Sequence, residues 1–156
     1  MRRRTAKRAE ALPDPKFKDV LVTKFVNNMM LEGKKNTAFK IFYDAIEIVS
    51  KKSPEEQGID VWKKALENVT PSVEVRSRRV GGATFQIPSP IRDSRKQSMA
   101  MKWLIGYSRK RNEKTMSQKL AAEVMAAAKG EGAAFKKKED VHKMAEANKA
   151  FSHFRF

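Results

Sequence analysis

The organisation of this chain is decided by residues 72–90, which read SVEVRSRRVGGATFQIPSP. Branched and aromatic side chains recur on both sides of Gly81-Gly82 and favour two strands. Two consecutive glycines can adopt positive φ at both central positions of a tight turn. Proline cannot donate to a strand ladder, so the pairing should end near Pro88. The stretch therefore predicts one β-hairpin.

The tight turn also predicts the register of the hairpin. The expected cross-strand pairs are Val80 with Ala83, Arg78 with Phe85, and Arg76 with Ile87, while Arg79, Ser77, Thr84 and Gln86 share the other face. Arginines beside an aromatic ring offer donors to phosphates and a flat surface to an unpaired base. Because a lone two-stranded ribbon is marginally stable in water, this arm should pack against its own domain and against an outside partner. The basic side chains indicate that the partner is nucleic acid.

Charge is the most informative feature of the composition. The 156 residues include 34 Lys and Arg against 18 Asp and Glu, a formal net charge of +16. Such a charge predicts binding to a polyanion and disfavours a small neutral ligand. The length suits one domain with a modest core. The sequence has no cysteine, which excludes disulfides and suits a reducing cytosol, and no stretch predicts a secretory signal or a membrane span.

Residues 1–16 are expected to form a basic N-terminal arm. Its cations lie in a stretch poor in apolar residues and are Arg2, Arg3, Arg4, Lys7 and Arg8. Basic arms of this kind commonly become ordered on a nucleic-acid backbone, although a terminal tail without a role has the same composition. Residues 17–149 are expected to form the helical domain from which residues 72–90 protrude, and residues 150–156 a C-terminal tail.

Helical spacing of apolar residues predicts three helices before the hairpin. Their apolar faces are Val22, Phe25, Val26, Met29 and Met30; Ala38, Ile41, Phe42, Ala45, Ile46 and Val49; and Trp62, Ala65, Leu66 and Val69. Gly33, Ser53-Pro54 and Pro71 would end them in turn. The third helix has two possible starts, a capping box at Ser53-Pro54 or a position one turn later at Gly58.

Three more helices are expected after the hairpin. Their faces are Ala100, Trp103, Leu104 and Tyr107; Met116, Leu120, Ala121, Val124, Met125 and Ala128; and, in a helix starting near residues 136–138, Val141, Met144, Ala145 and Asn148. Gly130 and Gly132 would separate the last two helices. Trp62 and Trp103 lie within apolar stripes, which favours core packing over base stacking. The predicted fold class is mainly α, a six-helix domain with one β-hairpin inserted between helices three and four.

Basic residues from separate parts of the chain predict a folded surface that binds a polyanion of defined shape. Outside the arm, the candidate phosphate-binding residues are Arg76, Arg78 and Arg79; Lys34 and Lys35; Arg92, Arg95 and Lys96; and Arg109, Lys110, Arg111 and Lys114. Cations at a helix start oppose the helix macrodipole, so residues 92–96 should serve an external anion. For Lys34-Lys35, a solvated loop is the alternative interpretation.

Several kinds of site are excluded by the same residues. Gly33-Lys34-Lys35 lacks the upstream glycine and the following Ser or Thr of a phosphate loop, which excludes nucleotide hydrolysis. His142 and His153 are the only histidines and no cysteine joins them, so no metal site, cofactor or catalytic residue is expected. An enzyme acting on RNA lacks an acid/base pair. A DNA-binding regulator is the rival interpretation, because basic helical domains often bind DNA.

Three segments, in the same order, resemble the bacterial small-subunit ribosomal protein seven family. They are GKKNTAFKIFYDA at 33–45, EVRSRRVGGATFQIP at 74–88 and KKKEDVHKMAEANKAFSHFRF at 136–156. The resemblance covers essentially the whole chain. Phe85, Phe154 and Phe156 stand where the family tends to have tyrosine or tryptophan, so stacking or packing is expected there without a hydroxyl or indole hydrogen bond.

The resemblance implies a structural constituent of the small ribosomal subunit in the cytoplasm, and not an enzyme. It would be a primary binder of the 3′ major domain of small-subunit rRNA that nucleates assembly of the head. The hairpin would lie near exit-site tRNA and messenger RNA, and the residues closest to them would be Arg79, Val80, Gly81, Gly82 and Ala83. Neighbouring ribosomal proteins, including proteins eleven and nine, would contact the chain.

Overall fold

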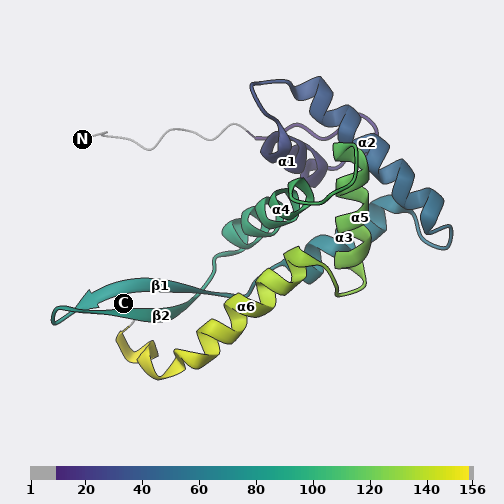
Figure 1. Cartoon of the computed structure of the whole chain (residues 1–156). Coiled ribbons are helices and arrows are strands. Elements are labelled where there is room, and N and C mark those ends of the chain that lie inside the picture. Colours follow the sequence, from purple (N-terminus) through teal and green to yellow (C-terminus); the bar gives the residue numbers. More distant parts are fainter. Residues whose placement is uncertain (1–9, 155–156) are drawn as a thin grey trace, which may run out of the picture.

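The structure, a computed structural model, describes residues 10–154. Within them the elements are α1 (Val20–Met29), α2 (Lys35–Lys52), α3 (Gly58–Val69), β1 (Val73–Val80), β2 (Ala83–Pro90), α4 (Asp93–Arg109), α5 (Met116–Ala128), α6 (Ala133–Ala147) and the 3₁₀ helix η1 (Lys149–Phe154). Figure 1 shows a body of helices from which the hairpin projects, with α6 and η1 running along one side of it. The expected fold class, with the hairpin between the third and fourth helices, is confirmed.

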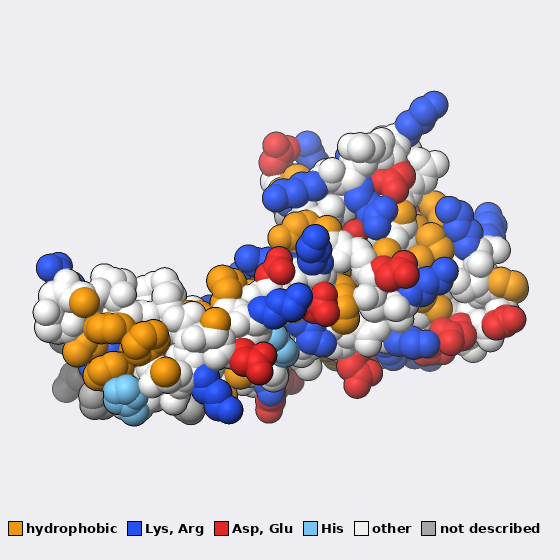
Figure 2. All heavy atoms as spheres, turned by 60° about the horizontal axis from the view of Figure 1, so that its bottom comes forward, with side chains coloured by type: hydrophobic (Ala, Val, Ile, Leu, Met, Phe, Trp, Pro, Cys, Tyr) orange, Lys and Arg blue, Asp and Glu red, His pale blue; other side chains and the backbone are white. Residues whose placement is uncertain are grey.

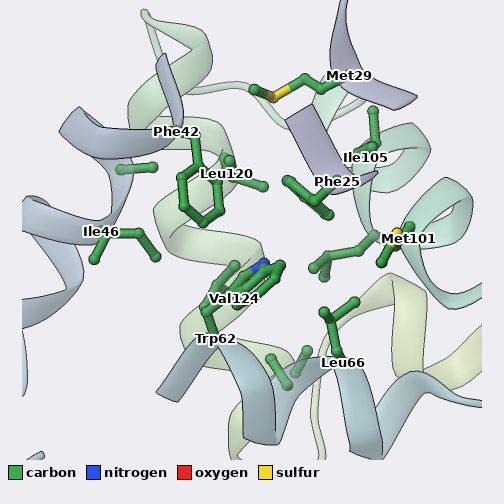
Figure 3. Packing of buried hydrophobic residues seen from close by; sticks show 14 of the residues in the cluster. Phe25, Met29, Phe42, Ile46, Trp62, Leu66, Met101, Ile105, Leu120 and Val124 are labelled. Carbon is green, nitrogen blue, oxygen red and sulfur yellow. The ribbon is translucent and has the colours of Figure 1, made fainter. Parts of the chain in front are cut away.

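The core lies where the helices of the body meet, and its centre is aromatic (Figure 3). The ring of Trp62 meets Phe25 at 5.4 Å and Phe42 at 5.2 Å between centroids, both edge to face. All three side chains are fully buried, which confirms core packing for Trp62. Trp103 packs at the edge of the core and is only half-buried. Within residues 10–154, this buried cluster joins helices from both sides of the hairpin into one body.

The start of α3 follows the later of the two predicted positions. Ser53 ends α2, where its N–H donates to the Val49 carbonyl at 2.9 Å, and it forms no capping box. The N–H of Gly58 donates to Ser50 Oγ at 3.2 Å. A Cβ at position 58 would lie 2.4 Å from that oxygen, so only glycine lets α3 begin this close to α2.

Two helical faces differ from the predicted ones. In α4 the buried side includes Met101 and Ile105, whereas Trp103 and Tyr107 lie half-buried at its edge. Two apolar sets overlap on this helix, and spacing alone does not tell which one the neighbouring helices cover. On α6, Met144 was expected to face the body but is 46% exposed.

Helix α6 also begins earlier than residues 136–138. Its first residue is Ala133, and the preceding Gly132 has φ of 92°. The carboxylate of Glu123 on α5 accepts the Ala134 N–H at 2.8 Å and so satisfies one of the free donors at the helix start. The prediction placed the start too late because this interaction comes from another helix.

A helix that crosses a lipid bilayer needs about 20 mainly apolar residues. No helix within residues 10–154 combines the length and the apolar character that crossing a membrane requires.

Candidate nucleic-acid interface

The hairpin has the register that its two glycines predict. Val80 pairs with Ala83, Arg78 with Phe85 and Arg76 with Ile87, along two antiparallel strands. Gly81 and Gly82 have φ of 57° and 92°, the positive values that a tight hairpin turn requires. The side chains of Arg76, Arg78 and Arg79 are exposed, so the arm carries its positive charge on the surface.

The hairpin is supported at the Arg78–Phe85 pair by the C-terminal segment. The ring of Phe85 packs against Phe151 at 5.2 Å and stacks on Phe154 at 5.4 Å between centroids. Arg78 Nη1 donates to the Phe154 carbonyl oxygen at 3.0 Å. The ring of Phe85 is therefore half-buried against tail rings, which confirms the packing expected at Phe85 and Phe154, while stacking of a base on it stays a prediction. Figure 2 shows the hydrophobic side chains gathered at the hairpin end of this face, while Lys and Arg spread over the body.

The base of the hairpin is attached to the body through α6. The backbone N–H of Ser72 donates to His142 Nε2 at 3.2 Å. Burial, with a smaller contribution from Lys138, lowers the pKa of His142 below its ordinary value and so favours the neutral ring that can accept this hydrogen bond. The expectation that the hairpin packs against its own domain is confirmed.

Phe154→Ala is expected to loosen the hairpin while leaving the helical body folded. Losing one aromatic pair costs about 1 kcal/mol, so amide hydrogen exchange in β1 and β2 should become several-fold faster. Ser152→Ala, an exposed change in the same 3₁₀ helix, is the matched control and should leave exchange unchanged. Unaltered amide exchange in β1 and β2 of Phe154→Ala would show that the tail does not support the hairpin.

The described part of the N-terminal arm is fixed to α2. Asp14 is buried, and its carboxylate accepts the N–H groups of Lys16 at 3.0 Å and Phe17 at 2.8 Å. Tyr43 Oη donates to the same carboxylate at 2.5 Å. Burial and the contact with Asp14 raise the pKa of Tyr43 to about 12, so the phenol remains protonated as the donor. The arm cations Arg2, Arg3, Arg4, Lys7 and Arg8 lie outside the described residues.

A second basic region forms where the α1–α2 turn meets the α4–α5 loop. Arg109 Nη2 donates to the Met29 carbonyl oxygen at 3.0 Å and so joins the end of α4 to the end of α1. Both segments line a hollow of about 510 Å³. Its lining is mainly apolar, and Lys34 and Arg109 contribute the positive charge. The structure thus brings together two clusters that lie far apart in the sequence.

Arg111, in the same loop, is largely engaged within the protein. Its Nε donates to Glu123 at 2.7 Å and its Nη1 to Glu113 at 3.3 Å. Burial opposes the charged form, but the hydrogen bond to Glu123 and the nearby negative charges raise the pKa of Arg111 above its ordinary value. Because Glu123 also caps α6, this ion pair ties the α4–α5 loop to α5 and α6. Sequence reasoning missed Glu123, although a carboxylate within the apolar spacing of α5 was the available signal.

The cations at the start of α4 differ in whether they pair with a carboxylate of the protein. Arg95 contacts Glu74 at 3.0 Å and Lys96 contacts Asp93 at 2.9 Å. Both therefore have carboxylate partners inside the protein, and an external anion is not needed to explain them. Arg92, at the N-cap of α4, makes no ion pair within residues 10–154, so the argument from the helix macrodipole holds for this side chain alone.

Glu74 is a buried carboxylate that the sequence interpretation did not identify. It binds Arg76 of the hairpin as well as Arg95 of α4. Burial would raise the pKa of Glu74, but hydrogen bonds from the two guanidinium groups outweigh it and hold the pKa below its ordinary value. The carboxylate is therefore ionised at neutral pH and joins the hairpin to α4.

Positive charge without a carboxylate partner comes from the remaining side chains. Within the described chain, the predicted cations that are exposed and make no ion pair with a carboxylate are Lys35, Arg79, Arg92, Arg109, Lys110 and Lys114. Lys34 pairs with Glu32, but both side chains are largely exposed. No group of three potential metal ligands occurs within residues 10–154. The arrangement can hold an extended anion at several separated points.

Known proteins similar to this chain have the same family description. The model of the family described as Ribosomal protein S7p/S5e matches residues 1–149. "Small ribosomal subunit protein uS7" of Christiangramia forsetii is 70% identical to this chain, and the protein of that name from Flavobacterium psychrophilum is 69% identical. The uS7 of Bacteroides fragilis is 58% identical, and all three alignments cover 100% of both chains. This chain therefore belongs to the ribosomal protein S7p/S5e family, whose members are structural constituents of the small ribosomal subunit and not enzymes.

Proposed function

We propose that this chain is a primary rRNA-binding protein that recognises the 3′ major domain of small-subunit rRNA and nucleates assembly of the head. The observation that carries this proposal is the separation of its exposed cations. They lie on the hairpin, the α1–α2 turn, the start of α4 and the α4–α5 loop, all held by one core. Cations fixed at several distant points fit phosphates of a folded RNA better than those of a straight duplex.

Recognition works mainly through shape. Phosphate contacts carry no sequence information themselves, but they position a rigid protein on RNA strands that lie at matching distances. The candidate contacts are the cations named from the sequence, with Arg109 and Arg111 also serving the fold through Met29 and Glu123. The residues from the basic arm would add further contacts where the chain leaves the body at Asp14.

The projecting hairpin suits a second role at the subunit interface. Its tip, residues 79–83, would approach exit-site tRNA and the messenger RNA, with Arg79 supplying an unpaired charge. The surface formed by the hairpin and η1 carries half-buried apolar side chains and would contact neighbouring proteins of the cytoplasmic small subunit, including proteins eleven and nine.

Competition between two nucleic acids tests the principal proposal. Labelled rRNA from the 3′ major domain is bound to the protein at moderate salt, and either unlabelled rRNA of the same domain or duplex DNA is added. The rRNA should displace the label at far lower concentration than the duplex. Equal competition by the two would favour the DNA-binding interpretation and overturn the proposal.

Deleting residues 78–83 is expected to separate the two roles of the protein. The helical core does not include the hairpin tip, so folding and the main affinity for the rRNA domain should be retained. Retention of exit-site tRNA by subunits assembled with the deletion should fall, as measured by filter binding. Arg79→Gln is the matched control for charge alone and should give a smaller change. Loss of folding or of rRNA affinity in the deletion would contradict this division of roles.

A further inference from the structure

The carboxylate of Glu74 lies between two arginines from different elements. Its side chain is only 8% exposed, whereas those of Arg76 and Arg95 are 63% and 56% exposed. Arg76 Nε donates to Oε1 at 2.6 Å, and Arg95 Nε donates to Oε2 at 3.0 Å. Each oxygen is thus held by one guanidinium group.

The two arginines use the same side of the guanidinium group for this contact. Besides Nε, Arg76 Nη2 lies 2.5 Å from Oε1 and Arg95 Nη2 lies 3.0 Å from Oε2. Within residues 10–154, Nη1 of neither arginine makes a hydrogen bond. Both guanidinium groups therefore keep N–H donors for an outside acceptor, and the three side chains together carry a net charge of +1.

Burying a carboxylate between two cations is a poor way to gain stability. Removing charges from water costs several kcal/mol, and apolar residues of similar volume often serve a core as well or better. The contact with Glu74 instead orders both arginine side chains in the free protein. Less conformational entropy is then lost when they bind a partner. The partial neutralisation by Glu74 also lets two like charges sit at one place.

We propose that Glu74 is a positioning residue that holds Arg76 and Arg95 as a clamp for a single RNA phosphate. This inference rests on the proposed binding to rRNA and assigns one contact within it. Arginine binds phosphate oxygens through paired N–H groups, and the free edges of the two guanidinium groups supply such donors from both sides. Because one arginine comes from β1 and the other from α4, the clamp also fixes the direction of the hairpin relative to the bound RNA.

Glu74→Gln tests the inference because the change of charge and the loss of positioning predict opposite changes in the affinity for RNA. Removing a carboxylate makes the protein more positive, so simple attraction predicts tighter binding to any RNA. Loss of positioning predicts roughly tenfold weaker binding to the rRNA domain, because both arginines must then be ordered on binding. Asp93→Asn, which removes a neighbouring exposed carboxylate, is the matched control and should not weaken binding. Equal affinities of the two variants for rRNA would overturn the proposal.

The salt dependence of binding gives a second measurement that does not depend on Glu74 being replaceable. Arg76→Gln, Arg95→Gln and the double variant change exposed side chains, and thermal unfolding identifies those that fold. If both arginines hold one phosphate, each single variant and the double variant should lower the log–log salt slope by about one unit. A loss of about two units in the double variant, or no loss, would contradict a shared phosphate.

The same titrations distinguish failure of the clamp from failure of rRNA binding. If the wild-type protein shows no preference for the rRNA domain over duplex DNA, the proposed function itself is wrong. If the wild-type protein shows that preference and Glu74→Gln binds the rRNA domain with unchanged affinity, only the clamp proposal is wrong.

Discussion

Trp62→Ala is expected to lower the free energy of unfolding by about 3–5 kcal/mol, the range for deleting a large aromatic side chain from a core. The indole is fully buried and packs edge to face on Phe25 and Phe42, so no neighbouring group is free to fill the space. Urea unfolding of the protein without RNA, followed by circular dichroism, measures the change. A loss of this size is a large fraction of the roughly 5–15 kcal/mol by which folded proteins are typically stable.

Two control variants define the cause of that loss. Trp62→Phe should recover much of the stability, because the indole Nε1 makes no hydrogen bond within residues 10–154 and only volume is removed. Trp103→Ala removes the same side chain from the edge of the core and should cost clearly less. If both alanine variants lost equal stability, the aromatic centre would not be the main support of the fold.

Replacing four lysines around the α1–α2 turn and in the α4–α5 loop by glutamine is expected to give the largest loss of rRNA affinity. The residues are Lys34, Lys35, Lys110 and Lys114. All are exposed, so the fold should be unaffected. Each phosphate contact contributes about 0.7–0.9 to the log–log salt slope, so losing four should lower it by about three units. Binding to the rRNA domain from 50 to 200 mM salt measures the slope.

An equally charged control distinguishes a defined site from general attraction. Lys51 and Lys52 end α2, Lys64 lies on α3 and Lys129 follows α5, and replacing these four lysines removes the same four charges. This variant should keep most of the slope and affinity. Similar losses in both variants would mean that the rRNA responds to total charge rather than to this surface.

Local signals explain the parts of the fold that the sequence predicted well. The register of the hairpin depends on two adjacent glycines and on alternation along eight residues, and both act within the segment. The helices likewise follow from spacing within each segment. The start of α6 could not be predicted in this way, because Glu123 supplies its first hydrogen-bond acceptor from α5.

The candidate site shows the same limit at the level of single side chains. Sequence clusters identified where cations gather, and Lys34 and Arg109 do lie at one hollow. Which of them already have partners depends on contacts between distant residues. Arg95 reaches Glu74 across 21 positions, and no local pattern marks that carboxylate as buried. The partners of Phe85 could not be predicted for the same reason, since Phe151 and Phe154 lie far from it in the sequence.

The contact of Phe85 with Phe151 and Phe154 has a consequence for the order of events during protein synthesis. Domains tend to fold from the N-terminus while the chain is still being made. The hairpin is made well before Phe151 and Phe154, so it gains their support only after these residues have been synthesised. A chain that stops before residue 151 would keep the folded helical body but would carry a hairpin without this aromatic support.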